Sequence, residues 1–121
     1  MNRTELGQWG EAQACALLEE KGYRIVARNY RCRLGEIDII ARRESVLAFV
    51  EVKLRRNAEY GEAREFVTVY KQKKIRLTAE SYLSLRDWAQ ELQPRFDVIE
   101  VYAPQGMDGS CSLKHLENAF E

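Results

Sequence analysis

The sequence predicts a mixed α/β fold with five strands and two helices in the order α-β-β-β-α-β-β. Two segments repeat apolar residues at helical spacing, and the others are rich in β-branched residues or alternate apolar with polar residues. A chain of 121 residues with 45% apolar side chains is long enough to bury one core. We therefore expect a single domain over residues 1–121.

The first helix is predicted over residues 5–21, where Leu6, Trp9 and Ala12 open an apolar stripe. Thr4 can cap its start, and Gly22 can close its end. Three strands then follow, and the polar step after the second indicates a hairpin turn at residues 42–45. These strands are expected over Tyr23–Arg31, Gly35–Arg42 and Val46–Arg55.

The second half of the chain continues with a helix and two strands. Arg56–Phe66 carries many charges without periodicity, which indicates a mobile loop rather than a domain linker. Thr68 can cap the second helix, whose apolar stripe fades before Pro94. The stripe is Ile75, Ala79, Tyr82 and Leu83, and the remaining elements are a strand over Arg95–Tyr102, a turn over Ala103–Ser110 and an edge strand over Cys111–Phe120.

Composition and hydropathy argue against a strongly basic nucleic-acid-binding protein, a CxxC zinc or redox protein, and a secreted or membrane-spanning protein. The charged residues, 31% of the chain, cancel to a net charge of zero, so nucleic-acid binding would have to come from local clusters. The three cysteines form no CxxC pair, and we expect them to be buried or idle thiols. No signal peptide or membrane-spanning run is evident, so we expect a cytoplasmic protein without a membrane partner.

Charged residues interrupt two strands that are otherwise built for burial. Glu51 and Lys53 share one face of the third strand, and Asp38 lies in the apolar run of the second. The hairpin would bring Asp38 and Glu51 side by side, where two carboxylates repel each other unless a cation lies between them. Oxygen ligands without His or Cys favour Mg²⁺ or Mn²⁺. An ordinary ion-pair network is the alternative interpretation, and the spacing leaves both open.

A resemblance to known proteins bears on this choice. Gly35-Glu36-Ile37-Asp38 followed by Phe49-Val50-Glu51-Val52-Lys53 resembles the D…ExK signature of the PD-(D/E)XK nuclease superfamily, the fold of restriction enzymes and archaeal Holliday-junction resolvases. With Gly7-x-x-Gly10-Glu11, Arg28-Asn29-Tyr30-Arg31, Val67 with Lys71-Gln72, and Arg95-Phe96-Asp97-Val98, the chain resembles the YraN family of small bacterial predicted endonucleases over nearly its whole length.

The resemblance implies a restriction-endonuclease-like α/β core, a central sheet of about five strands flanked by two helices, and a role for each motif residue. Asp38 and Glu51 would be metal ligands, helped by the carbonyl of Val52. Lys53 would position or activate the attacking water, and Glu11 would be a further catalytic acid on the first helix. A surface glutamate that favours the helix dipole is the alternative for Glu11.

The second helix adds a cluster of cations near its start, although cations there oppose the helix dipole. A phosphate backbone would turn this repulsion into attraction. Lys71, Lys73, Lys74 and Arg76 are therefore candidate nucleic-acid contacts, and a solvated face is the alternative. Gln72 points either toward the site or into the edge of the core. We expect Tyr30 to be a core residue and assign His115 no role.

These observations predict a metal-dependent endonuclease that hydrolyses phosphodiester bonds of nucleic acid. The expected partner is DNA, including branched or structured DNA, and the expected state is a monomer or homodimer. A catalytically inactive nucleic-acid-binding module on the same fold is the alternative. Retention of Asp38, Glu51 and Lys53 argues against it, because binding alone does not need acids that face a polyanion.

Overall fold

The computed structural model of the protein describes residues 3–56 and 67–121, and its elements follow the predicted order. Apart from Arg56, the predicted loop over residues 56–66 lies outside the described residues. The helices and strands are α1 (Arg3–Glu20), β1 (Arg24–Cys32), β2 (Gly35–Arg43), β3 (Val46–Arg55), α2 (Val69–Ser84), β4 (Gln93–Tyr102) and β5 (Ser112–Phe120).

The five strands form one mixed sheet in the order β1-β2-β3-β4-β5. All neighbours are antiparallel except β3 and β4, which are parallel. A parallel pair needs a crossover connection, and here the crossover contains α2. The mixed sheet and the edge position of the last strand are therefore as predicted.

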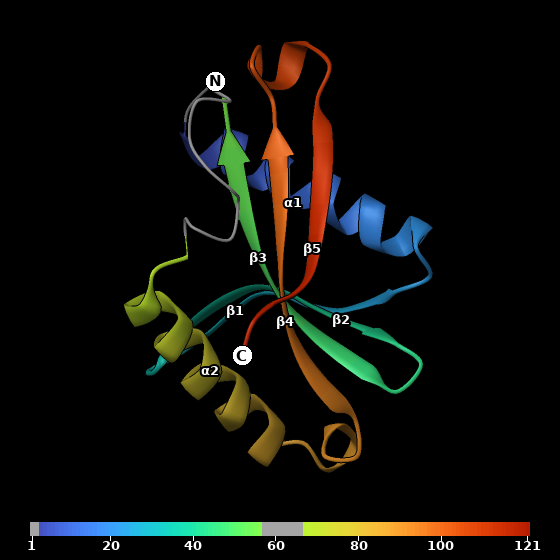
Figure 1. Ribbon diagram of the computed structural model, residues 1–121, viewed down its shortest axis with the longest axis vertical. Helices are drawn as coiled ribbons and strands as arrows, with labels where there is room; N and C mark the ends of the chain where they lie inside the picture. Colours follow the sequence, from blue (N-terminus) through green and yellow to red (C-terminus); the bar gives the residue numbers. More distant parts are fainter. Residues whose placement is uncertain (1–2, 57–66) are drawn as a thin grey trace.

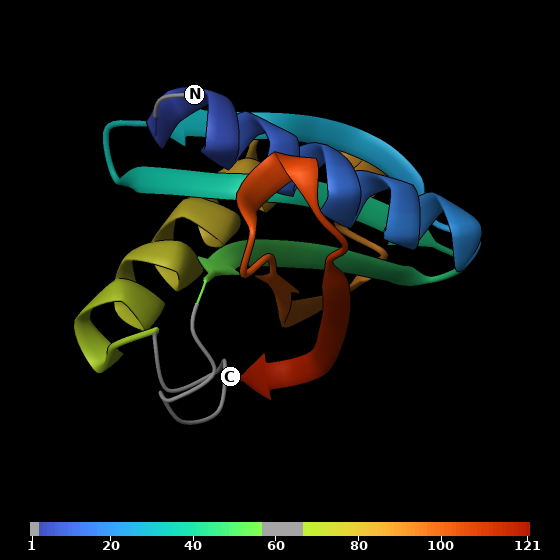
Figure 2. The ribbon, with the colours of Figure 1, turned by 90° about the horizontal axis from the view of Figure 1, so that it is seen from above.

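The two helices cover opposite faces of the sheet, which lies between them as a middle layer (Figures 1 and 2). Ala14 and Leu18 of α1 pack with Ile39, Val50 and other buried residues in one cluster. Ile75, Ala79 and Tyr82 of α2 pack with Phe49 and other buried residues in a second cluster. The predicted alternation of β3 is thus confirmed, because Phe49 and Val50 face different helices.

The ends of the helices confirm two predictions and correct one. Thr68 precedes α2, and its hydroxyl accepts from the Lys71 N–H at 3.1 Å. Gly22 follows α1 with a φ of 92°, and the Tyr23 N–H reaches back to the Leu18 carbonyl, as in a Schellman motif. Thr4, predicted as the cap of α1, instead lies inside the helix, which already includes Arg3.

Two short 3₁₀ helices, η2 (Asp87–Ala89) and η3 (Gly106–Asp108), are not predicted by the sequence pattern, because three residues are too few to show a periodicity. Among the described segments, none is a helix with the length and apolar character needed to cross a bilayer.

Candidate active site

The acidic site forms where β2 and β3 part. Their pairing ends at Ile39 and Val50, one residue short of Asp38 and Glu51. At that point the Val52 N–H donates to Asp38 Oδ2 at 2.8 Å, so the carboxylate replaces a backbone acceptor. Ile37 packs on the α2 side and Ile39 on the α1 side, although residues two apart on a regular strand share a face. The strand therefore twists at Asp38.

Asp38 and Glu51 line one open cavity of about 440 Å³, as the hairpin geometry predicts. The start of α2 closes its other side because the helix packs closely on the β1–β2 turn. A Cβ added to Gly35 would lie 2.7 Å from Thr78 Oγ1 of α2, so only glycine allows this approach. The other lining residues are Arg31, Cys32, Gly35, Glu36, Lys71, Lys74 and Ile75.

Burial and a neighbouring charge act on Asp38 together. Burial of the carboxyl, followed by the negative charge of Glu51, raises the pKa of Asp38 to about 7, and the Val52 N–H only partly offsets this. Glu11 contributes to the same increase through its charge. Within the described residues Asp38 forms no direct ion pair, although the Lys71 ammonium acts on it through its charge, and it lies beside a second acid, so a divalent cation would stabilise its ionised form.

Two lysines converge on Glu51, which is 5% exposed. Lys53 Nζ lies 3.5 Å from Glu51 Oε1, and Lys71 Nζ from α2 makes a closer ion pair with the same oxygen. Burial and the neighbouring Lys71 ammonium lower the pKa of Lys53. Although burial acts against it, the hydrogen bond and charge of Glu51 raise the pKa of Lys71. Of the two ammonium groups, that of Lys53 therefore loses its proton more readily.

Glu11 of α1 lies within electrostatic reach of this site. Its side chain is 16% exposed, and Arg28 Nη2 is 3.9 Å from Oε1, which is too long for a hydrogen bond. The same oxygen is buried without a hydrogen-bond partner. Because an unsatisfied buried carboxylate oxygen is costly, Glu11 is a plausible acceptor for a water molecule or another ligand.

The donor set fits a hard divalent cation. Asp38 and Glu51 supply carboxylate oxygens, and the backbone of Val52 faces Asp38 through its N–H bond. Over residues 3–56 and 67–121, no group of three or more His, Cys, Asp or Glu side chains forms a ready-made metal cluster. Mg²⁺ commonly binds with only one or two carboxylates, and water and substrate phosphate complete its coordination.

The predicted cation cluster of α2 is divided by the structure. Lys71 belongs to the acidic site, and Lys74 lines the cavity while its Nζ lies 5.4 Å from the ring centroid of Tyr70. Arg76 donates to the Glu121 carbonyl at 2.6 Å, and Lys73 is exposed. Gln72 donates to the Val67 carbonyl at 2.9 Å, so its amide stabilises the start of the helix.

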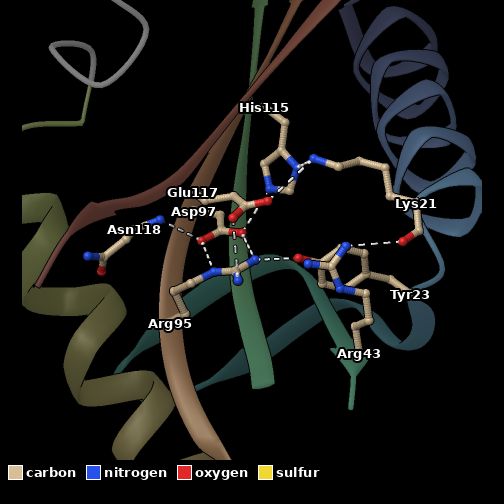
Figure 3. A network of polar contacts seen from close by, with 8 residues as sticks. All are labelled: Lys21, Tyr23, Arg43, Arg95, Asp97, His115, Glu117 and Asn118. Carbon is tan, nitrogen blue, oxygen red and sulfur yellow. Dashed lines mark hydrogen bonds and ion pairs between the residues drawn. The ribbon is translucent and has the colours of Figure 1, made fainter. Parts of the chain in front are cut away.

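A second buried carboxylate was not identified as important from the sequence. Asp97 of β4 is fully buried and accepts from Arg95, His115 and the Asn118 N–H (Figure 3). Lys21 contacts His115 Nδ1 at 2.6 Å, and because an ammonium only donates, His115 must hold its proton on Nε2. His115, to which we assigned no role from the sequence, therefore joins β5 to β4 and to the residue that follows α1.

Other predicted residues have ordinary positions. Tyr30 packs edge-on against Tyr82 and belongs to the core, as expected. Cys15 is buried, and burial raises the pKa of its thiol. Gly7 has open space at its Cβ position, whereas a Cβ on Gly10 would contact Leu54 Cδ1 at 3.4 Å. That contact is an ordinary one, so we have no structural account of either glycine.

Comparisons with a family model and with individual sequences give the same family. Residues 10–101 match the uncharacterised protein family UPF0102. Similar relatives, each named only as a UPF0102 protein, come from Caldicellulosiruptor saccharolyticus, with 46% identity over 84% of this chain and 86% of the relative, and from Lachnoclostridium phytofermentans, with 42% identity over 100% and 97%. A relative from Pelobacter propionicus is 45% identical over 95% of this chain and 81% of its own.

Proposed function

The chain belongs to the uncharacterised protein family UPF0102, and we propose that it is a metal-dependent nuclease of the PD-(D/E)XK type that hydrolyses phosphodiester bonds of nucleic acid. One observation carries the proposal. Two acids from neighbouring strands, Asp38 and Glu51, line the same open cavity, and Lys71 and Lys74 line it too. Carboxylates beside cations suit a site that holds both a metal ion and a phosphate.

In this proposal Asp38, Glu51 and the Val52 carbonyl hold Mg²⁺ or Mn²⁺. The bound ion would polarise the scissile phosphate and lower the pKa of a coordinated water. Its charge would also stabilise the ionised form of Asp38, whose pKa of about 7 otherwise leaves a large protonated fraction at neutral pH.

The lysines supply the rest of the chemistry. Lys53, whose pKa is lowered by burial and by Lys71, can take a proton from the attacking water or hold that water by a hydrogen bond. Lys71 keeps its charge and lines the cavity, where it can neutralise a phosphate oxygen. Glu11 has a buried oxygen free to accept a hydrogen bond from a water molecule at the margin of the site.

The first experiment tests the metal. Titration with Mn²⁺ in a calorimeter should show binding that Asp38→Asn and Glu51→Gln each abolish. Glu36→Gln is the matched control, because Glu36 lines the same cavity but is exposed and pairs with Arg31 at 3.2 Å. Equal affinity in the wild type and both site variants would refute the metal site.

The second experiment tests cleavage. Purified protein with Mn²⁺ is incubated with duplex, single-stranded, flapped and four-way DNA and with RNA, and the products are separated by size. Cleavage that requires the metal and is lost in Glu51→Gln supports the proposal and identifies the substrate. We expect DNA to be cut, by a cytoplasmic monomer or homodimer.

A binding module without catalysis is the second candidate, and the ion pair between Lys71 and Glu51 favours it. This ammonium already neutralises Glu51, so the fold is complete without a metal. The module would bind the same substrates with equal affinity in Mn²⁺ and in EDTA and would cut none of them.

A further inference from the structure

A second charged site lies at the end of the sheet away from the acidic cavity. Arg24 of β1 and Arg42 of β2 are directly paired across the strands, so their side chains share one face. Both line a hollow of about 360 Å³ together with Ile25, Val26 and Trp88. We call this the arginine–tryptophan hollow.

The two arginines repel each other without compensation. Like charges directly opposite on a sheet are destabilising, and within the described part of the chain no carboxylate forms an ion pair with either residue. Arg42 Nε donates only to the Glu44 carbonyl, at 3.3 Å. An adjoining hollow adds Arg43 and the carboxylate of Glu44, which leaves three cations against one acid. An anion placed here would turn the repulsion into attraction.

Trp88 adds an aromatic wall to the same hollow. It lies in η2, just after α2, and is 45% exposed, which is unusual for so large an apolar side chain. Its ring meets Tyr82 edge-on, with the centroids 6.3 Å apart and an interplanar angle of 87°. Indole surface therefore remains beside the two guanidinium groups, a combination that suits a nucleotide, with a charged phosphate and a flat base.

We propose that the arginine–tryptophan hollow binds one unpaired nucleotide of the nucleic-acid strand on which the acidic site acts. Arg24 and Arg42 hold its phosphate, and its base stacks on Trp88. The base must be unpaired, because a base inside a duplex has both faces covered by its neighbours. This inference rests on the proposed function, because it assumes that the bound nucleotide belongs to the strand on which the acidic site acts.

The spacing of the two sites suits a single strand. Asp38 and Arg42 are four positions apart along β2, which corresponds to about 13 Å at the rise of a β-strand. On the neighbouring edge strand β1, exposed Arg28 lies opposite Ile39, between the levels of the two sites, and exposed Arg31 lies opposite Glu36 and lines the acidic cavity. A strand that follows β1 would therefore meet positive side chains from the acidic cavity to the hollow.

Binding can be measured separately from cleavage, in EDTA. Fluorescence anisotropy would compare a labelled oligothymidylate with a blunt duplex over a series of salt concentrations. Arg24→Gln/Arg42→Gln should flatten the salt dependence for the single strand by roughly 0.7 in log–log slope, the value for the loss of one phosphate contact. Lys114→Gln is the control, because it removes the charge of an exposed lysine on the opposite edge strand β5. It should leave the slope nearly unchanged.

The stacking contact has its own signal. In a Trp9→Phe background Trp88 is the one tryptophan left in the chain, and oligothymidylate should quench its fluorescence while inorganic phosphate should not. Trp88→Leu keeps an apolar cover on Tyr82 but removes the aromatic face, and should weaken single-strand binding by roughly tenfold, as for one base stack.

The outcomes separate this inference from the proposed function. An unchanged salt slope in the arginine variant, together with unquenched Trp88, would refute nucleotide binding in the hollow. The arginine pair would then only keep other chains from pairing with the edge of the sheet. Tighter binding of the blunt duplex than of the single strand would also refute it. If the hollow binds as expected but no substrate is cut in Mn²⁺, only the nuclease proposal fails.

Discussion

Asp38 and Asp97 occupy the same sheet but opposite electrostatic environments. Asp97 receives donors from Arg95, His115 and a backbone N–H (Figure 3). Although burial acts to raise it, these hydrogen bonds lower the pKa of Asp97. Asp38 has one backbone donor and an acidic neighbour, and its pKa is raised to about 7. The fold supplies three donors to the carboxylate of Asp97 but only one to that of Asp38, for which we propose a metal ion as the further partner.

We expect this difference to separate a structural site from a functional one. Asp97 joins residues of β4 and β5, and the same network reaches Tyr23 and Lys21 at the end of α1. Removing its charge should loosen the fold. Asp38 opens on a cavity beside a second acid, so under the proposed function removing its charge should impair metal binding and leave the fold intact.

The largest effect on stability should come from Asp97→Asn. The variant leaves the mostly buried Arg95 charge without its partner, and breaking one side of such a buried pair costs about 3–5 kcal/mol. Asp38→Asn should be as stable as the wild type or more so, because an amide oxygen can still accept from Val52. Urea unfolding of both variants gives the comparison. Equal losses in the two would show that both aspartates are structural.

Lys53→Met tests the catalytic role proposed for the acidic site around Asp38. Methionine keeps the apolar length of the side chain, so the fold should persist. Cleavage should fall by roughly 10² to 10³ fold, as when one transition-state donor is removed. Single-turnover rates with saturating protein measure the step, and anisotropy in EDTA checks that substrate affinity is retained. A wild-type rate in Lys53→Met would exclude the assigned role.

The two aspartates should also differ in pH dependence. Between pH 3.8 and about 7 the unfolded chain ionises Asp38 before the folded protein does, so stability should fall as the pH rises. We expect a loss on the order of 2 kcal/mol, about half of what the two pKa values alone would give, because solvent and the nearby lysines screen the charge. The contribution of Asp97, with its lowered pKa, is lost only below pH 3.8.

Thermal unfolding of wild type and Asp38→Asn across this range, with EDTA present, is the measurement. The variant should flatten the decline, and saturating Mg²⁺ should stabilise the wild type most at the alkaline end. A decline that is identical in Asp38→Asn would place its origin in another group.

The smallest effects should come from charges that the fold neither buries nor pairs. Lys73→Gln/Lys74→Gln should flatten the salt dependence of duplex binding by roughly 1 to 2 in slope if these lysines touch phosphates. Relief of the unfavourable helix dipole should leave the melting temperature equal or slightly higher. Anisotropy and thermal unfolding measure the two effects. An unchanged slope would assign nucleic-acid binding to surfaces such as the β1 edge.

The fold was largely predictable because each element has a local signal. Thr68 caps a helix, Gly22 ends one, and the alternation around Phe49 and Val50 assigns the two faces of β3. The meeting of Asp38 and Glu51 followed from one short hairpin. Short-range rules suffice for such features because their partners are close in sequence.

The rest depends on contacts between distant segments. Lys71 looked like a surface cation of α2, and its pairing with Glu51 appears only once the helix is packed on the sheet. Asp97 and His115 are 18 residues apart and meet through the pairing of β4 with β5. Arg24 and Arg42 likewise meet across two strands. None of these pairs has a spacing that distinguishes it from ordinary surface charges.

The parting of β2 and β3 at Asp38 also bears on the order of folding. The β1–β2–β3 meander is built from contacts near in sequence, whereas α2 and the parallel strand β4 join it only after a long loop closes. We therefore expect the acidic pair to come together before Lys71 can reach it, so that its repulsion raises the folding barrier. Asp38→Asn should accordingly speed refolding more than it slows unfolding, which stopped-flow measurements on both limbs would show.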